Sequence, residues 1–164
     1  MKVGIVSDTH GKTSRLKRAL DILLARGAEI IVHCGDVGSE DCIVALAETH
    51  LPCYVVAGNM DKHVDRLAAT AKEVGVNFEL SKIIITLDDG QRIAITHGND
   101  GGVIRELLAD DSIGYICVGH THKAADERIG QKRLINPGAL RHAHPTTVAI
   151  LDTQTDTVEH IRIK

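Results

Sequence analysis

Aromatic residues are scarce in this sequence. They make up 2% of its 164 residues, with two tyrosines, one phenylalanine and no tryptophan. Proteins that bind single-stranded nucleic acid without sequence preference stack the bases on several aromatic side chains. The formal net charge is -3, so the chain also lacks the cationic excess of a polyanion-binding protein. The composition therefore argues against an extended nucleic-acid surface.

Long hydrophobic runs are absent as well. The apolar runs, such as residues 30–32 and 83–85, are far shorter than the roughly 20 apolar residues that a membrane helix requires. Residues 1–8 have the pattern of a strand that ends in an acidic turn, and they lack the features of a signal peptide. We therefore expect no membrane partner and a cytoplasmic protein.

The four cysteines form no Cys-x-x-Cys motif. A chain of this length buries enough surface to fold without disulfides, so reduced, buried thiols are expected. Hydrophobic residues account for 43% and charged residues for 25%, which is typical of soluble globular proteins. Length and composition together indicate one domain over residues 1–164.

Strand and helix patterns alternate in the first third of the chain. Short apolar segments predict strands at 2–7, 30–34 and 53–56, and apolar residues at helical spacing predict helices at 13–26 and 40–49. The second half is rich in hairpin signals, with strands predicted at 83–87, 91–96, 115–118, 126–129, 133–135, 146–152 and 158–163 and one short helix at 102–110. The fold class is therefore α/β, with a mixed, two-sheet centre.

Polar residues that can bind metal ions directly follow several predicted strands. They are Asp8, His10, Asp36, Asn59, His97, His120 and His122. With 10 histidines in the chain, a short motif such as Asp-x-His has little meaning alone, and Asp61-x-His63 is a second copy that follows no strand. Position carries the signal, because ligands of open α/β sheets bind at the carboxyl ends of strands. We therefore predict that these seven side chains converge.

This set contains two carboxylates, one amide and four imidazoles, but no thiolate. Such donors favour divalent manganese, iron, zinc, nickel or magnesium, and we favour manganese. Seven ligands exceed one tetrahedral shell, so we expect two divalent ions, with Asp36 as the bridging carboxylate. Two such ions with two carboxylates leave a positive site that attracts phosphate.

Five blocks of this sequence resemble the calcineurin-like metallophosphoesterases. They are Asp8-x-His10, Gly35-Asp36, Gly58-Asn59-x-Asp61, His97-Gly98 and Gly119-His120-Thr121-His122. A loop at 136–139, Asn-Pro-Gly-Ala, resembles the Asn-Pro-Gly-Ser loop of the small single-domain phosphodiesterases in that family. The likeness extends over nearly the whole chain.

The resemblance implies a four-layer α/β/β/α sandwich with two mixed sheets and a two-metal centre. It assigns Asp8, His10 and His122 to one ion and Asn59, His97 and His120 to the other, with Asp36 shared. A metal-bridging hydroxide would then attack phosphorus in line. We predict catalytic roles for Asp36, Asn59 and Asp61, the last by orienting a ligand or its loop, and substrate contacts for Asn59, Gly138, Arg141 and His142.

One departure from the family pattern concerns the leaving group. Many members carry a histidine directly after the asparagine, where it can protonate the leaving oxygen, but this chain has Met60. We therefore expect a phosphodiesterase that acts on small phosphoesters with good leaving groups. His63 is an alternative acid or a solvated helix residue, and Arg141, His142 and His144 are substrate contacts or a polar rim.

Two rival functions stay open. One is a phosphomonoesterase of the same fold, and the other is a non-catalytic scaffold subunit of the same fold. Exposed apolar positions on the helices also allow a homo-oligomer.

Overall fold

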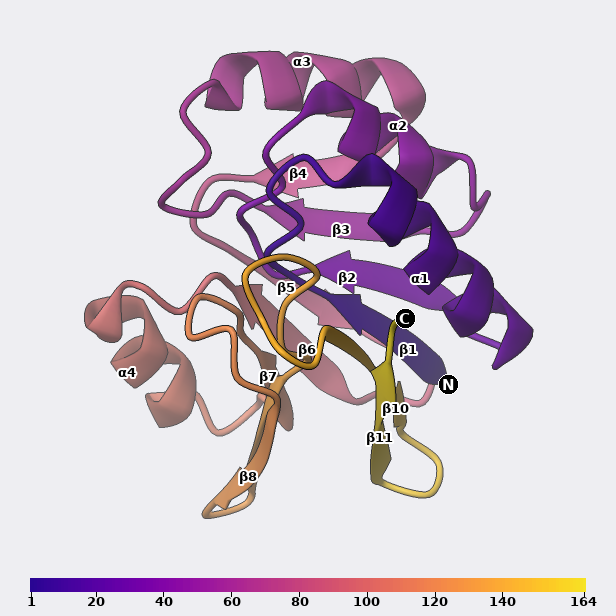
Figure 1. The fold of residues 1–164 in the computed structure, drawn as a ribbon. Helices are drawn as coiled ribbons and strands as arrows, with labels where there is room; N and C mark the ends of the chain where they lie inside the picture. The colour runs from indigo at the N-terminus through magenta and orange to yellow at the C-terminus, as the bar shows by residue number, and fades with distance from the viewer.

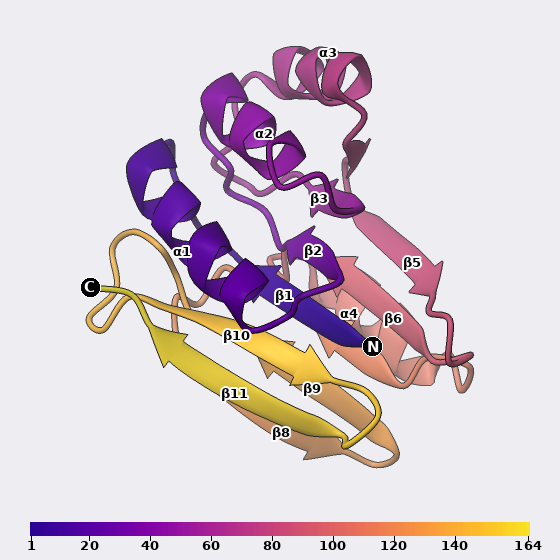
Figure 2. The same cartoon turned by 90° about the vertical axis from the view of Figure 1, so that its right-hand side faces the viewer.

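Two mixed β-sheets pack face to face in the computed structural model, which describes residues 1–164, and helices lie on their outer sides (Figures 1 and 2). The first sheet has the order β11-β10-β1-β2-β3-β4, with bounds Thr157–Arg162, Thr147–Asp152, Lys2–Val6, Ile30–His33, Cys53–Val56 and Asn77–Glu79. The second has the order β5-β6-β7-β9-β8, with bounds Lys82–Thr86, Arg92–Thr96, Tyr115–Cys117, Lys132–Asn136 and Ala125–Ile129.

Four helices cover these sheets. Three of them lie along the outer face of the first sheet, namely α1 (Thr13–Ala25), α2 (Glu40–Ala47) and α3 (Val64–Val74) (Figure 2). The fourth, α4 (Gly101–Ala109), packs on the second sheet through Leu107. The predicted four-layer α/β/β/α sandwich is therefore confirmed.

The strands β1 to β4 run parallel, and so do β6, β7 and β9, while the remaining strands are antiparallel. All four residues of β2 are buried, because one face packs on the helices and the other on the second sheet. Burial on both faces explains why the central strands are continuously apolar rather than alternating. Ile5, Val32 and Ile95 belong to the core between the sheets.

Two elements were not predicted from the sequence. The helix α3 buries only Leu67 and Ala71, so its apolar stripe is narrow. The strand β4 has three residues, none of them fully buried, and it lies at the edge of its sheet. The β4 segment carries no run of apolar residues, whereas the apolar residues of α3 do recur at helical spacing, at Val64, Leu67, Ala71 and Val74.

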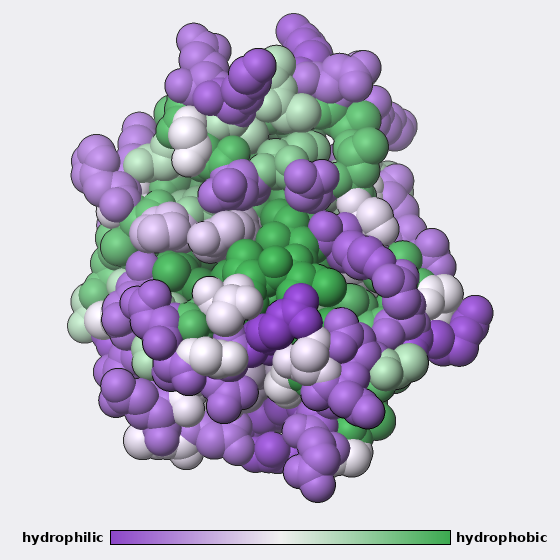
Figure 3. Space-filling model, turned by 180° about the vertical axis from the view of Figure 1, so that it is seen from behind, coloured by the Kyte–Doolittle hydropathy of each residue, from purple (hydrophilic) through white to green (hydrophobic).

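One outer face is less completely covered than the others. The edge strand β5 leaves four of its five residues half-buried, and the view from behind shows hydrophobic residues gathered near the middle of that face (Figure 3). None of the helices has the length and apolar character needed to cross a membrane.

Candidate metal centre

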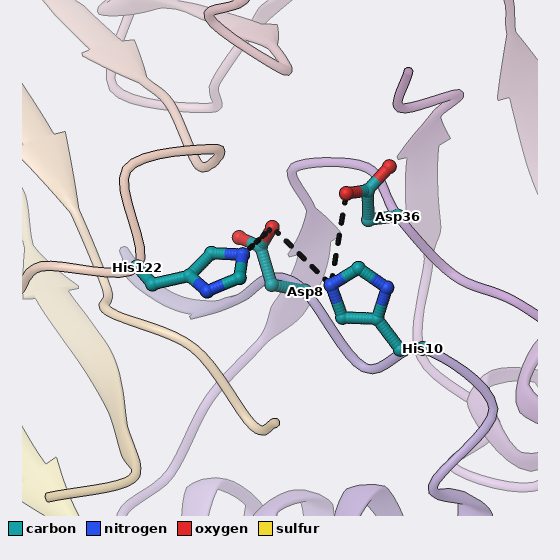
Figure 4. Close-up of side chains that lie close together, drawn as sticks. All are labelled: Asp8, His10, Asp36 and His122. Carbon is teal, nitrogen blue, oxygen red and sulfur yellow. Dashed lines mark ion pairs between the residues drawn. The ribbon is translucent and has the colours of Figure 1, made fainter. Parts of the chain in front are cut away.

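The seven predicted ligands follow the carboxyl ends of five strands. Asp8 and His10 follow β1, Asp36 follows β2, Asn59 follows β3, and His97, His120 and His122 follow β6 and β7. The parallel strands within each sheet end on the same side, so their following loops meet at one edge of the sandwich. Figure 4 shows four of these side chains pointing toward one another.

The first group comprises Asp8, His10, Asp36 and His122. One ligand atom from each lies within 4.8 Å of the others. His122 Nε2 is 3.0 Å from Asp8 Oδ1, while His10 Nε2 is 3.9 Å from Asp8 Oδ1 and 3.7 Å from Asp36 Oδ2. His122 is close enough to Asp8 for an ion pair, although no hydrogen bond forms between them, and the two separations from His10 are too long for hydrogen bonds.

The first group contains two buried atoms whose surroundings indicate that a cation fits there. Asp8 Oδ1 and His10 Nε2 are buried and have no hydrogen-bond partner in the protein. A buried polar group without a partner costs about 1–3 kcal/mol, so this arrangement is unfavourable unless a ligand satisfies it. A divalent ion that accepts both lone pairs fits the donors that are present.

The second group comprises Asp36, Asn59, His97 and His120. Asn59 Oδ1 is 2.9 Å from His97 Nε2 and 3.0 Å from His120 Nδ1. Asp36 Oδ2 is 3.5 Å from His97 Nε2. Since the same oxygen is also close to His10, Asp36 lies between the two groups.

The orientation of His97 explains why the second group also calls for a cation. Its Nδ1–H donates to the carbonyl of Cys34 at 2.7 Å, so a neutral ring directs the lone pair of Nε2 toward Asn59 and Asp36. Three acceptors facing one another repel unless a proton or a metal ion lies among them. Burial lowers the pKa of His97, but the contacts with Asp36 and Cys34 outweigh it and raise that pKa overall.

The carboxylate and imidazole of the first group are poised to bind. Burial works to raise the pKa of Asp36, but the contact with His97 and the N–H of Met60, 2.8 Å from Asp36 Oδ1, together hold that pKa below its usual range. Burial lowers the pKa of His10, which outweighs the neighbouring carboxylates. An ionised Asp36 and a neutral His10 are the protonation states that metal coordination requires.

Neighbouring residues fix the direction in which the ligands point. The Ser7 hydroxyl and the N–H of His120 donate to Asp8 Oδ2, at 2.6 and 3.2 Å, which leaves Oδ1 free to face the histidines. The side-chain amide of Asn136 donates to Gly119 O at 2.8 Å and to Thr121 Oγ1 at 3.0 Å, which holds the loop of His120. The sequence analysis gave no role to Ser7 or Asn136, although each stands inside or beside a recognised block.

The side chain of Asp61 contacts none of the seven candidate metal ligands. Its carboxylate accepts N–H groups from Val37 at 3.1 Å, Gly38 at 2.8 Å and Gly58 at 2.8 Å. These bonds join the loop of Asp36 to the loop of Asn59. The arrangement corresponds to the loop-orienting role predicted for Asp61.

The ligand loops share an uncommon backbone conformation. Six residues here have positive φ angles between 45° and 66°, although none of them is glycine: Asp8, His10, Asp36, His120, His122 and His142. Non-glycine residues in this left-handed region cost about 1–3 kcal/mol and cluster at functional sites. His142 therefore shares the conformation of the ligands.

The predicted substrate residues occupy different places. The ring of His142 is centred 5.4 Å from that of His10 and 6.4 Å from that of His122, and Arg141 Nη1 donates to His10 O at 2.9 Å. Gly138 is different: it is buried, its N–H donates to Asn136 Oδ1, and an added Cβ would lie 2.0 Å from Thr147 Oγ1. Close packing of its loop requires a glycine at position 138, and its substrate contact stays a prediction.

His33, which contacts Thr9 between two of the candidate ligands, makes the stability of the protein depend on pH. This fully buried histidine contacts Thr9 Oγ1 through Nε2 at 2.7 Å and accepts the N–H of Gly35 on Nδ1, and burial lowers its pKa to about 3. His33 stays unprotonated in the folded protein until the pH approaches about 3, whereas in the unfolded chain it binds a proton below about pH 6.5. Its contribution to the free energy of unfolding is therefore complete above about pH 6.5 and is lost as the pH falls toward about 3.

We expect His33→Gln to flatten the acid side of the stability profile. In metal-stripped protein, the wild type should lose about 2 kcal/mol more unfolding free energy than the variant between pH 6.5 and pH 5, as measured by urea unfolding. The matched control is His63→Gln at an exposed histidine, which should leave the slope unchanged. Equal slopes for wild type and His33→Gln would contradict the assignment.

The family of the chain follows from a sequence comparison. Residues 1–156 match the model of the calcineurin-like phosphoesterase superfamily domain. This chain belongs to that superfamily. The expected resemblance and the expectation of a metal-dependent phosphoesterase are thereby confirmed at the level of the family.

Individual relatives support the same branch. The chain is 28% identical over 156 residues to Phosphodiesterase MJ0936 of Methanocaldococcus jannaschii, covering 94% of each protein. It is 27% identical over 168 residues to Phosphodiesterase YfcE of Escherichia coli K12, covering 93% of this chain and 88% of that one. A solved structure of an archaeal phosphodiesterase superposes with a TM-score of 0.89 at 27% identity, over 99% of this chain and 100% of the other.

Proposed function

We propose that this superfamily member is a phosphodiesterase that works with two divalent ions. Asp8, His10 and His122 would hold one ion, Asn59, His97 and His120 the other, and Asp36 both. The observation that carries this proposal is the pair of converging donor groups that share Asp36 Oδ2, with Asp8 Oδ1 and His10 Nε2 lacking any other partner. Manganese is the favoured ion, since the donors are oxygen and imidazole nitrogen.

Ions bound at these positions supply a water nucleophile of lowered pKa and neutralise charge on the phosphoryl oxygens. The residues of the chain do the rest. Asn59 directs Oδ1 toward His97 and His120, and its Nδ2 is free of protein partners, so it can donate to a phosphoryl oxygen. Asp61 keeps the loops of Asp36 and Asn59 in register through its three backbone contacts.

Met60 favours diesters over alkyl monoesters. Its side chain is 53% exposed beside the centre and carries no proton that could reach a leaving oxygen. It lines a pocket of about 300 Å³ together with His63, which precedes α3 and is exposed. Without a positioned acid, substrates with good leaving groups react best, because protonation matters most for leaving oxygens of high pKa.

The scaffold alternative is the less favoured one. A scaffold has no need of buried, unpartnered donor atoms, which destabilise the fold unless they bind something. The monoesterase alternative depends on an acid that can replace Met60.

An assay of metal-stripped protein tests the proposal. We expect Mn²⁺ to restore hydrolysis of bis(p-nitrophenyl) phosphate, with Ni²⁺, Mg²⁺ and Zn²⁺ compared in parallel. Met60→His should then raise kcat/KM for glycerol 2-phosphate about tenfold or more, and raise that for the diester less, because it supplies the missing proton. Leu24→His is the control, at an exposed leucine near the end of α1, where α1 lies beside the start of β1 and not beside the ligand loops.

Two outcomes count against the proposal. If no ester is hydrolysed with any of the four ions, the scaffold function is favoured. If Met60→His improves the diester more than the monoester, the argument from the missing acid is wrong.

A further inference from the structure

A second pocket adjoins the metal centre on the side of His142. It has a volume of about 690 Å³, and its charged and titratable lining residues are Arg15, His142, His144, Arg162 and Lys164. We call it the basic pocket. Its residues come from α1, from the loop between β9 and β10, and from the chain at and just after the end of β11.

The basic pocket concentrates positive charge without local compensation. Three of its lining residues, Arg15, Arg162 and Lys164, are permanently cationic at neutral pH, and no lining residue carries a carboxylate side chain. None of these three forms a salt bridge elsewhere in the protein. The main-chain oxygen of Lys164 is hydrogen-bonded by Arg18. A chain of net charge -3 therefore presents an unpaired cationic cluster here.

Hydrogen bonds hold parts of this pocket in place. Arg15 Nη1 donates to Leu140 O at 2.6 Å, which leaves the rest of its guanidinium for another acceptor. The Thr146 hydroxyl donates to Ile163 O at 2.6 Å, and the N–H of Ile163 donates to Thr146 O at 2.9 Å. These last two bonds join the end of β11, with Arg162, to the loop that carries His144.

The basic pocket adjoins the metal centre through His142. The His142 ring lines the pocket and also stacks on His122, with an interplanar angle of 13°. The N–H of Leu140 donates to Ser7 O and that of Arg141 to Asp8 O, at 3.1 and 3.0 Å, so the loop preceding His142 is paired with the ligand-bearing end of β1. A molecule with its phosphorus at the metal centre can thus extend past His142 into the basic pocket.

The pocket beside Met60 differs in charge. There Arg66 Nε lies 3.2 Å from Glu40 Oε1, and Asp61 also lines it, so its cations face carboxylates. Of these two pockets, the basic pocket is the one whose charged side chains are all cationic, which suits an anion such as phosphate that accepts several charged hydrogen bonds.

We propose that the basic pocket binds a second phosphate group on the organic arm of the substrate. The inference rests on the proposed phosphodiesterase function and narrows its substrate class to phosphodiesters that carry a further phosphate, as a phosphorylated nucleotide ester does. Arg162 and Lys164 would contact the second phosphate, and Arg15 and His142 would line its path from the metal centre.

Two matched substrates test this inference with the Mn²⁺-loaded full chain. Thymidine 5′-(p-nitrophenyl phosphate) and its 3′-phosphorylated counterpart release the same leaving group and differ only in the second phosphate. We expect kcat/KM to be about tenfold higher for the phosphorylated ester, mainly through KM, since one charged contact is worth about that factor. Raising the ionic strength from about 0.05 M to about 0.5 M should shrink this ratio.

Arg162→Gln should bring the ratio between the two substrates close to one, and adding Lys164→Gln should abolish any remaining preference. The control is Arg66→Gln, whose arginine already pairs with Glu40, and it should retain the wild-type ratio. Hydrolysis of both esters with a wild-type ratio near one, or an equal loss on both esters in Arg162→Gln, would overturn the inference. Failure to hydrolyse either ester would instead count against the phosphodiesterase function.

Discussion

Asp36→Asn should lower metal occupancy and hydrolysis together. Its carboxylate oxygen Oδ2 faces His10 of one donor group and His97 of the other, at 3.7 and 3.5 Å, so no other residue can compensate for its charge in both. Metal ions supply several kcal/mol of transition-state stabilisation, and each 1.4 kcal/mol is a factor of ten in rate. We therefore expect kcat/KM for bis(p-nitrophenyl) phosphate to fall on the order of 10³-fold.

Metal content by atomic spectroscopy, measured on the same preparations, separates the two effects. It should fall from two ions per chain to one or none. The matched control is Asp21→Asn, an exposed aspartate on α1, which should keep both ions and full activity. If Asp36→Asn retains two ions per chain, Asp36 is not the shared ligand.

Gly58→Ala should damage both stability and metal affinity. A Cβ atom at this position would lie 2.1 Å from Asp36 Oδ1 and 2.2 Å from the Asp36 main-chain nitrogen, so the ligand loop must move. Overpacking of this kind costs about 1–3 kcal/mol of unfolding free energy. Displacing a supported ligand costs about 10- to 100-fold in metal affinity. Thermal unfolding with and without Mn²⁺ measures both, and the stabilisation by Mn²⁺ should shrink in the variant.

Gly101→Ala is the matched control for this substitution. Gly101 lies in the first turn of α4, where an added Cβ would meet only the end of Arg105, at 3.4 Å. Alanine is a better helix former than glycine, so the variant should be as stable as the wild type or up to about 1 kcal/mol more stable. If Gly58→Ala proves as harmless as Gly101→Ala, the close approach of the two loops is not required.

Most strands and helices could be predicted because buried segments have a recognisable pattern of apolar residues in the sequence. The segments 30–34 and 115–118 are apolar apart from His33, and in the structure both faces of their strands are covered. The strand β4 could not, since it has three residues and buries none of them. The helix α3 was missed although its apolar residues recur at helical spacing, at Val64, Leu67, Ala71 and Val74.

The candidate ligands were predictable for a related reason. Strand ends are visible in the sequence, so Asp8 and Asp36 could be placed at one edge before any distance was known. The partners of these ligands could not be placed in the same way. Asn136 acts through a hydrogen bond to a backbone group of another loop, and such a contact depends on the fold rather than on spacing. The close packing around Gly138 could not be predicted, because the sequence does not distinguish a glycine required by packing from one that contacts a ligand.

The left-handed backbone at the ligand positions restricts which residue types can stand there, in addition to the requirement for a metal-binding side chain. Aspartate, asparagine and histidine tolerate positive φ better than most other side chains, while β-branched and bulky residues do not. Five of the seven candidate ligands meet this backbone demand as well as the demand of the metal. Exchanging Asp8 or His122 for a ligand of different chemistry must therefore satisfy two requirements at once. Redesign of the centre for another class of ion is limited by main-chain geometry before it is limited by coordination chemistry.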